Sequence, residues 1–465
     1  MKNALFATFL TTTLLFVGCT EPPVITIQEP GDPTARRPFP QAGWNQQMRP
    51  TTVSQDQLNR DIIRLYRDLR DRSLRTSTNG KHSYFAAGGT GVNGSRALTN
   101  SETHGYGMLI LVLMAGANGD ERAIFDRMNA LRKVQGSTTP SRTEGSRNNL
   151  MSWVIHDAES SNPVPEVRSC WQEEERCWTV GTCVNGSGRP ATFGRSNSAT
   201  DGDMDMAYAL ILAHRQWNDQ RYLDDAREII ASIKELNFHL NNPDHPNESI
   251  AQYRTNLGDW HGRWNSNTLA SRTTSRTSDW MPGHFRAFHA ATGDNFWLSA
   301  ADEVYSLLRQ VSHTGTGLMP DFIIDVPARV VASAAEAVVA GEHNWYNYAF
   351  NACRVPWRLA LDFVHNGNAD ARTQINTISN WLRGATNANP GEIAQGYNVD
   401  GTVVTSGFAM AFTAPFAAGM LGDTRNQTFL NATYSALASR QGSSFYNDAL
   451  RLLSLLLVTG NWWAP

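Results

Sequence analysis

Apolar residues recur every three or four positions in many separate stretches of this 465-residue chain, beginning near residue 55. In the first stretch, Ile62, Ile63, Tyr66 and Leu69 fall on one face of a helix. The same spacing is typical of helices that bury one side. It predicts further helices in residues 108–114, 207–217, 226–236, 297–308, 357–364, 375–382, 409–420 and 449–457.

Long segments rich in Gly, Asn, Ser and Thr separate these stretches, and two of them, residues 136–149 and 255–278, indicate extended loops. Strands and helices do not alternate along the chain, so a doubly wound parallel sheet is not expected. About a dozen helices in one continuous run, with polar motifs between them, favour an all-α fold in the form of a single α/α barrel.

The first 18 residues have the pattern of an export signal, because Lys2 precedes an apolar stretch that is too short to span a membrane. Residues 15–19 (LFVGC) resemble a bacterial lipobox, although Phe16 stands where an aliphatic residue is usual. We therefore expect an exported lipoprotein in the outer membrane or periplasm, attached only through Cys19; a plainly secreted protein is the alternative. Residues 19–50 are rich in proline, which predicts a tether before a folded domain at residues 51–465.

The composition of the chain indicates which partners it can bind. Its net charge is −3, so it has no excess of basic residues to bind the phosphates of a nucleic acid, and a nucleic-acid partner is not expected. The 14 Trp residues suit a carbohydrate cleft, where flat rings stack on sugars, although most such rings belong to ordinary cores.

Cys170, Cys177 and Cys183 lie in one loop-like segment. In an exported protein one disulfide among them is expected, and which two of them pair is not determined. No His lies among them at ligand spacing, so no metal or cofactor is expected.

Three carboxylates, Asp201, Asp203 and Asp205, occupy alternate positions of residues 199–210 (ATDGDMDMAYAL), directly before an apolar helical run. Asp201 is expected at the helix N-terminus, where free N–H groups and the helix dipole keep a carboxylate ionised. Taken alone, the segment is most simply a helix cap followed by two solvated carboxylates. Two other segments change that interpretation.

Residues 101–108 (SETHGYGM) also precede a helix, which Glu102 could simply cap. However, His104, Tyr106 and two glycines surround this Glu. A Glu among aromatic and apolar neighbours can have its pKa raised enough to serve as a proton donor.

Residues 346–358 (YNYAFNACRVPWR) form the third distinctive segment. Arg354 and Arg358 are four residues apart and would share one side of a helix, for which Pro356 suits the first turn. Both arginines could pair with carboxylates to hold loops together, a role that suits Arg358 in particular.

These three segments, ATDGDMDMAYALILAHRQW, SETHGYGM and NACRVPWR, resemble the hallmark segments of glycoside hydrolase family 8. NNLMSW, DWMPGHFRAF and TGLMPDF, at residues 148–153, 279–288 and 316–322, are similar to other family segments in the expected order. The resemblance implies a six-hairpin (α/α)6 barrel. It also implies an inverting endo-β-1,4-glycanase without cofactor.

Inversion needs two carboxyl groups about 6.5–9.5 Å apart, one protonating the leaving oxygen and one activating water. By resemblance Glu102 is the acid and Asp201 grips and distorts the sugar at the point of cleavage. Asp203 and Asp205 would support that site or the helix start. Further predicted substrate contacts come from Tyr106, Trp153, Asp203, Trp260, Trp280, Tyr348, Asn351 and Arg354, with Trp264 and Trp345 as additional candidate sugar platforms.

The base is where this sequence departs from the commonest family pattern. Many members carry an Asp base at the position of Asn351, and an amide cannot accept a proton at neutral pH. The resemblance to a branch with Asn there implies a Glu base in the preceding loop, where Glu342 is favoured and Glu336 is the alternative; a base outside both also stays open.

The leading hypothesis is a monomeric hydrolase of a β-1,4-linked polysaccharide. Cellulose or mixed-linkage β-glucan ranks first, chitosan second and xylan third. A carbohydrate-binding or assembly lipoprotein that kept the barrel without turnover is the alternative, supported by the missing Asp at position 351.

Overall fold

The computed structural model describes residues 32–41, 48–77, 80–87, 97–141, 143–156, 197–238, 252–260, 270, 273–331 and 345–465. Within them lie twelve α-helices: α1 (Gln55–Ser73), α2 (Ser101–Leu113), α3 (Glu121–Val134), α5 (Thr200–Trp217), α6 (Gln220–Leu236), α8 (Pro282–Thr292), α9 (Phe296–Val311), α10 (Val355–Asn366), α11 (Ala369–Ala385), α12 (Met410–Gly419), α13 (Gln427–Ser439) and α14 (Phe445–Val458). None of these helices is long and apolar enough to cross a membrane.

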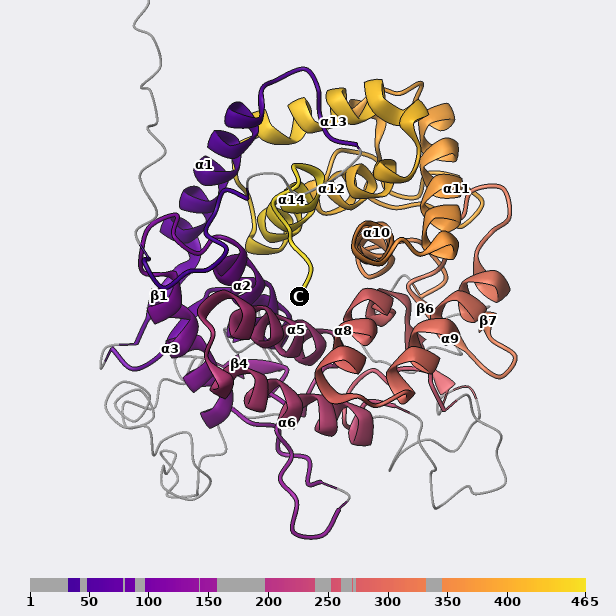
Figure 1. Ribbon diagram of the computed structural model, residues 1–465. Helices are drawn as coiled ribbons and strands as arrows, with labels where there is room; N and C mark the ends of the chain where they lie inside the picture. The colour runs from indigo at the N-terminus through magenta and orange to yellow at the C-terminus, as the bar shows by residue number, and fades with distance from the viewer. Residues whose placement is uncertain are drawn as a thin grey trace, which may run out of the picture.

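The helices form two concentric rings (Figure 1). The inner ring consists of α2, α5, α8, α10, α12 and α14, and each contacts the next until α14 closes the circle on α2. The outer ring consists of α1, α3, α6, α9, α11 and α13, so the chain alternates between outside and inside. This is an (α/α)6 barrel, and the predicted fold class is confirmed.

Helices of the inner and outer rings differ in how much of their surface is buried. Helix α12 buries every residue from Met410 to Gly419, as an inner helix with neighbours on all sides must. Helix α1 buries one face only, which includes the predicted Ile62, Ile63, Tyr66 and Leu69. Three helices, α3, α8 and α13, were not predicted from the apolar spacing.

Two glycines bring the first turns of α2 and α5 into contact. A Cβ atom added to Gly202 would lie 2.4 Å from the carbonyl carbon of Ser101, and one added to Gly105 would lie 2.8 Å from Cβ of Asp205. Any larger residue would therefore separate these helices. The close approach places Glu102 and Asp201, one on each helix, at the same end of the barrel.

Short antiparallel strands lie next to that end. β3 (Ala97–Asn100) runs directly into α2 and pairs with β4 (Val154–His156), Asn100 opposite Val154. β5 (Ser275–Arg276) precedes α8 and pairs with β6 (Phe322–Ile324), which pairs in turn with β7 (Arg329–Val330). β1 (Leu74–Thr76) and β2 (Ser83–Phe85) form a separate pair after α1.

Residues 32–41, which we call the strap, pack against the opposite end of the barrel. The Arg36 N–H donates to the carbonyl of Gln216 (2.8 Å), at the end of α5, and the Phe39 N–H donates to that of Ala115 (2.8 Å), beyond α2. The Phe39 side chain is 3% exposed. The strap therefore belongs to the folded body rather than to the tether predicted for residues 19–50.

Candidate active site

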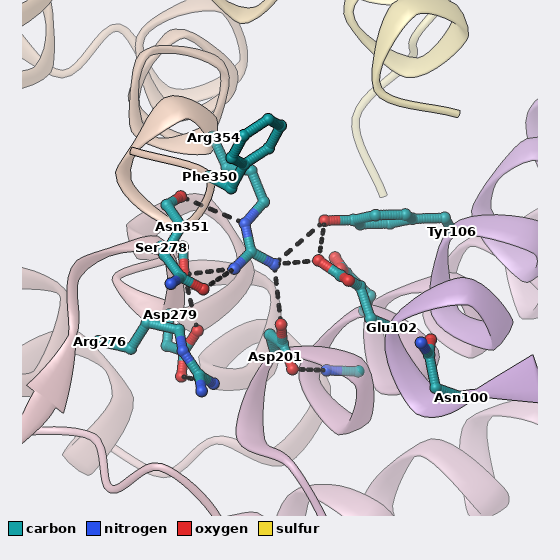
Figure 2. Close-up of polar contacts among 12 residues, drawn as sticks. Asn100, Glu102, Tyr106, Asp201, Arg276, Ser278, Asp279, Phe350, Asn351 and Arg354 are labelled. Atoms are coloured by element: carbon teal, nitrogen blue, oxygen red, sulfur yellow. Dashed lines mark hydrogen bonds and ion pairs between the residues drawn. The ribbon is translucent and has the colours of Figure 1, made fainter. Parts of the chain in front are cut away.

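Four elements bring polar side chains together at the N-terminal ends of the inner helices (Figure 2). Glu102 lies in the first turn of α2 and Asp201 in the first turn of α5. Ser278 comes from the 3-10 turn η3 (Thr277–Asp279) before α8, and Arg354 from the 3-10 turn η5 (Ala352–Arg354) before α10.

Arg354 lies at the centre of this cluster and is 2% exposed. Its Nη1 forms ion pairs with Oε1 of Glu102 and with Oδ2 of Asp201, the latter at 2.8 Å. Its Nη2 donates to Oγ of Ser278 (2.7 Å) and to Oδ1 of Asn351 (3.1 Å). One guanidinium group thus orients side chains from all four elements.

Glu102 is the most accessible carboxyl group of the cluster, with 23% of its side chain exposed against 7% for Asp201. The hydroxyl of Tyr106, one turn along α2, donates to its Oε1 at 2.9 Å. Burial, opposed by Arg354, raises the pKa of the Glu102 carboxyl above its ordinary value. The group is therefore suited to hold a proton and to deliver it to a substrate.

The pKa of the Asp201 carboxyl is shifted in the opposite direction to that of Glu102. Burial acts to raise its pKa, but Arg354 and Arg276 outweigh it and hold the pKa below its ordinary value. Its Oδ1 also accepts the backbone N–H of Gly202 at 2.9 Å. Two neighbouring carboxyl groups whose environments move their pKa values apart can divide acid and anionic roles between them.

Two buried carboxyl groups near Arg354 were not singled out from the sequence. Asp321 accepts hydrogen bonds from Asn351 and its neighbours, and burial raises its pKa to about 6. Asp279 accepts from Ser278 Oγ (3.1 Å), and burial raises its pKa to about 7. Both belong to segments that carry the family resemblance, 316–322 and 279–288, which was the available signal.

Asp205 lies in a second, sealed cluster. Arg358 binds both of its oxygens, at 2.7 and 2.6 Å, and His284 Nε2 lies 2.9 Å from Oδ1. Although burial acts in the opposite direction, Arg358 lowers the pKa of Asp205 to about 2. This cluster joins α5, α8 and α10, which gives Arg358 the structural role considered from the sequence.

Five predicted substrate contacts are buried. Tyr106 and Arg354 belong to the cluster around Glu102, whereas Asp203, Trp280 and Tyr348 contact other parts of the fold. Asp203 is 0% exposed and accepts the Met151 N–H at 2.9 Å, so it holds the 151–153 segment rather than a sugar. Trp280 is 1% exposed and donates to Ser275 Oγ, and Tyr348 is 0% exposed and stacks on Phe416. Trp345, a further candidate platform, is also buried. These rings pack in the core, and the sequence pattern could not show this because it does not distinguish a core ring from a cleft ring.

Trp153 is 37% exposed. Its backbone accepts from the Ser101 N–H (2.9 Å) and donates to the Asn197 carbonyl (2.7 Å), which fixes it beside the starts of α2 and α5. Trp260 is partly exposed. Phe350, 45% exposed and drawn beside Arg354 in Figure 2, was not predicted; its ring packs edge-on against Phe412.

Several predicted residues lie outside the described residues. They are both candidate bases, Glu342 and Glu336, the candidate platform Trp264, the lipobox Cys19, and the cysteines Cys170, Cys177 and Cys183.

The barrel and its cluster define a class of protein. A carboxyl group with a raised pKa, partly open to solvent and next to a carboxylate with a lowered pKa, is suited to protonate a glycosidic oxygen while its neighbour stabilises the cation that forms. The class is that of the glycoside hydrolases.

Comparison with known proteins gives the family. Residues 177–460 match the family model described as glycosyl hydrolases family 8. A β-glucanase of Niallia circulans is 30% identical over 437 residues, which cover 92% of this chain and 91% of that protein. The chain therefore belongs to glycosyl hydrolases family 8, and the resemblance found in its sequence is confirmed.

Other relatives agree. An endoglucanase of Bacillus sp. strain KSM-330 is 30% identical over 441 residues, covering 92% of this chain and 82% of that protein. The solved apo structure of a β-1,3-1,4-glucanase from Paenibacillus sp. X4 matches with a TM-score of 0.73 at 28% identity, covering 92% of this chain and 99% of that one. A reducing-end xylose-releasing exo-oligoxylanase, 17% identical, shares the fold with a TM-score of 0.59 over 89% of this chain and 94% of its own.

Proposed function

We propose that the chain is an inverting endo-β-1,4-glycanase of mixed-linkage β-glucan or cellulose, with Glu102 as the general acid. The observation that carries the proposal is the Glu102 carboxyl itself, which is partly exposed, bound by Tyr106 and raised in pKa beside an anionic Asp201. The names of the relatives, β-glucanase and endoglucanase, support this substrate class ahead of chitosan and xylan.

The reaction follows from these groups. Glu102 gives its proton to the glycosidic oxygen as the bond from that oxygen to the anomeric carbon breaks. Arg354 and Tyr106 already bind the carboxyl and stabilise the carboxylate that remains. Asp201 stays ionised and faces the developing positive charge on the sugar. Water attacks the anomeric carbon from the opposite face and passes its proton to the base.

The base is proposed to come from the segment of residues 327–346. Among the described carboxyl groups around Arg354, Asp279 and Asp321 are 0% and 3% exposed, so neither has the solvent access that a base acting on water needs. Glu342 is favoured and Glu336 is the alternative. We expect Glu342→Gln to lower kcat severely with little change in KM, with partial rescue by azide, while Glu336→Gln has a mild effect. The reverse ranking would transfer the role to Glu336.

A panel of four polysaccharides tests the function. Cellulose, mixed-linkage β-glucan, chitosan and xylan are incubated with wild-type protein, and released reducing ends are measured. We expect release from β-glucan or cellulose, a falling viscosity that marks internal cleavage, and an initial α-anomer in the NMR spectrum of the product. An initial β-anomer would contradict inversion.

A protein that binds glycans without turnover is the second candidate, and Asn351 at the usual base position supports it. Folded protein that binds members of the panel and releases no reducing ends from any of them would favour it.

The protein is further proposed to be exported, anchored by lipid on Cys19 and monomeric. Cys19→Ser should then move it from the membrane fraction to the soluble fraction. A wild-type protein that is itself soluble would contradict the lipid anchor and leave the plain secretory signal.

A further inference from the structure

Asp321 is surrounded by four donors from one short segment of chain. Its Oδ1 accepts the backbone N–H groups of Ala349 (3.0 Å) and Ala352 (2.7 Å). Its Oδ2 accepts the backbone N–H of Asn351 (3.2 Å) and the side-chain Nδ2 of Asn351 (3.0 Å). A carboxylate has about four acceptor positions, so all of them are in use.

This saturation decides what Asp321 can do. A base that activates water needs an oxygen free to accept the proton of that water, and Asp321 offers none while being 3% exposed. Its chemistry is instead that of an anion that organises a turn, because backbone N–H groups converging on one carboxylate fix the path of residues 349–352.

The side chain of Asn351 links Asp321 to Arg354. Its carboxamide has only one satisfactory orientation, since an ionised Asp321 can only accept and Arg354 can only donate. Nδ2 therefore faces Asp321 and Oδ1 faces Arg354 Nη2, at 3.1 Å. The other nitrogen of Arg354 binds Glu102 and Asp201.

We propose that Asp321 is a positioning residue of the reaction: through the Asn351 carboxamide it holds Arg354 in place between Glu102 and Asp201. The inference rests on the proposed role of Glu102 as the acid. A second carboxylate at position 351 would lie about 3 Å from Asp321, and two such groups share one proton rather than both ionise.

The test is a double-mutant cycle on Asp321 and Asn351. Asp321→Asn removes the anion, so Arg354 loses its fixed position. We expect kcat to fall about 100-fold, with KM changing less than about threefold, because geometry at the reacting centre is lost while binding elsewhere remains. The alkaline limb of the kcat–pH profile should move upward, because a displaced Arg354 no longer lowers the pKa of Glu102.

Asn351→Asp alone should also lower activity at neutral pH. The exchanged variant Asp321→Asn/Asn351→Asp places the single charge on the other side of the same contact. Its kcat should be at least about tenfold higher than that of Asp321→Asn. It should stay below the wild-type kcat, because the backbone N–H of residue 351 loses its acceptor.

Asp362→Asn is the matched control. Asp362 is 0% exposed and accepts from Arg286, Tyr305 and Asn366, none of which binds Arg354, and it lies in the C-terminal half of α10. It should lower the melting temperature without moving the pH profile. Circular dichroism and thermal unfolding give the folded fraction of each variant.

The proposal is overturned if Asp321→Asn keeps the wild-type pH profile and loses activity only in proportion to its folded fraction, as the control does. It is also overturned if the exchanged variant recovers nothing, or if Asn351→Asp alone is as active as wild type at neutral pH. Glu102→Gln serves as the reference. An active Glu102→Gln variant rejects the assigned acid, whereas an inactive one beside a normal Asp321→Asn variant rejects only the role of Asp321.

Discussion

Arg354 and Arg358 are one turn apart, both at most 2% exposed, and both bind carboxylates that come from α5. Arg358 binds Asp205 through two parallel contacts, and this carboxylate is 0% exposed. Arg354 divides its donors among Glu102, Asp201, Ser278 and Asn351, and Glu102 reaches solvent. The buried Arg358–Asp205 pair therefore joins helices. Arg354 instead contacts Glu102, a carboxyl group that solvent reaches and that can exchange a proton with a substrate.

The largest effect should come from the open cluster. Glu102→Gln keeps the shape of the side chain and removes its proton, so kcat should fall about 10²–10⁴-fold or more. Binding of oligosaccharide, measured by calorimetry, should stay within a few-fold of wild type. Hydrolysis at a rate near that of wild type would mean that another group supplies the proton.

The sealed cluster should respond through stability. Arg358→Met leaves the Asp205 charge buried without its partner, and breaking such a pair costs roughly 3–5 kcal/mol of the free energy of unfolding. Arg309→Met is the control, because the Arg309–Asp370 pair (3.6 Å) is more than 60% exposed on both sides and should contribute less than about 1 kcal/mol. Denaturant titration distinguishes the two, and equal losses would contradict the contrast between sealed and exposed pairs.

The same contrast separates two tryptophans. Trp153→Ala should raise KM about tenfold with a normal melting temperature, because the exposed ring offers a face for stacking on a sugar. Trp280→Ala should instead destabilise the fold, by roughly 3–5 kcal/mol, because it empties a core position. If Trp153→Ala leaves KM unchanged, the ring does not contact substrate.

The smallest effect is a shift in pH dependence. Glu102 must be protonated to act, so activity is lost as the pH rises through its pKa. Because burial raises that pKa, the alkaline limb of kcat/KM should lie above the value of an ordinary Glu, about 4.3. Arg354→Met should move the limb further up, since Arg354 acts to lower the pKa. A downward movement would contradict the assignment of the limb to Glu102.

The sequence predicted helices best where one apolar face repeats, as in α1. It missed α8, which begins with Pro282 and Gly283 and carries a buried His284, because an inner helix need not show a single apolar face. Local segments indicated Glu102, Asp201, Asn351 and Arg354, and the structure brings these four together. Asp321 lies in the family-like segment 316–322 but was not singled out, because its contact with Asn351 joins residues 30 positions apart and leaves no periodic trace.

The strap has a consequence for how the enzyme would meet a polymer. It ends the folded body at the C-terminal ends of α2 and α5, whereas Glu102 and Asp201 occupy their N-terminal ends. If Cys19 carries the proposed lipid, 12 residues lie between it and Asp32, and this segment can span at most roughly 45 Å at full extension. An enzyme anchored in this way would have its strap facing the bilayer and Glu102 and Asp201 facing away from it. Long glycan chains could then reach these residues without crossing the lipid headgroups.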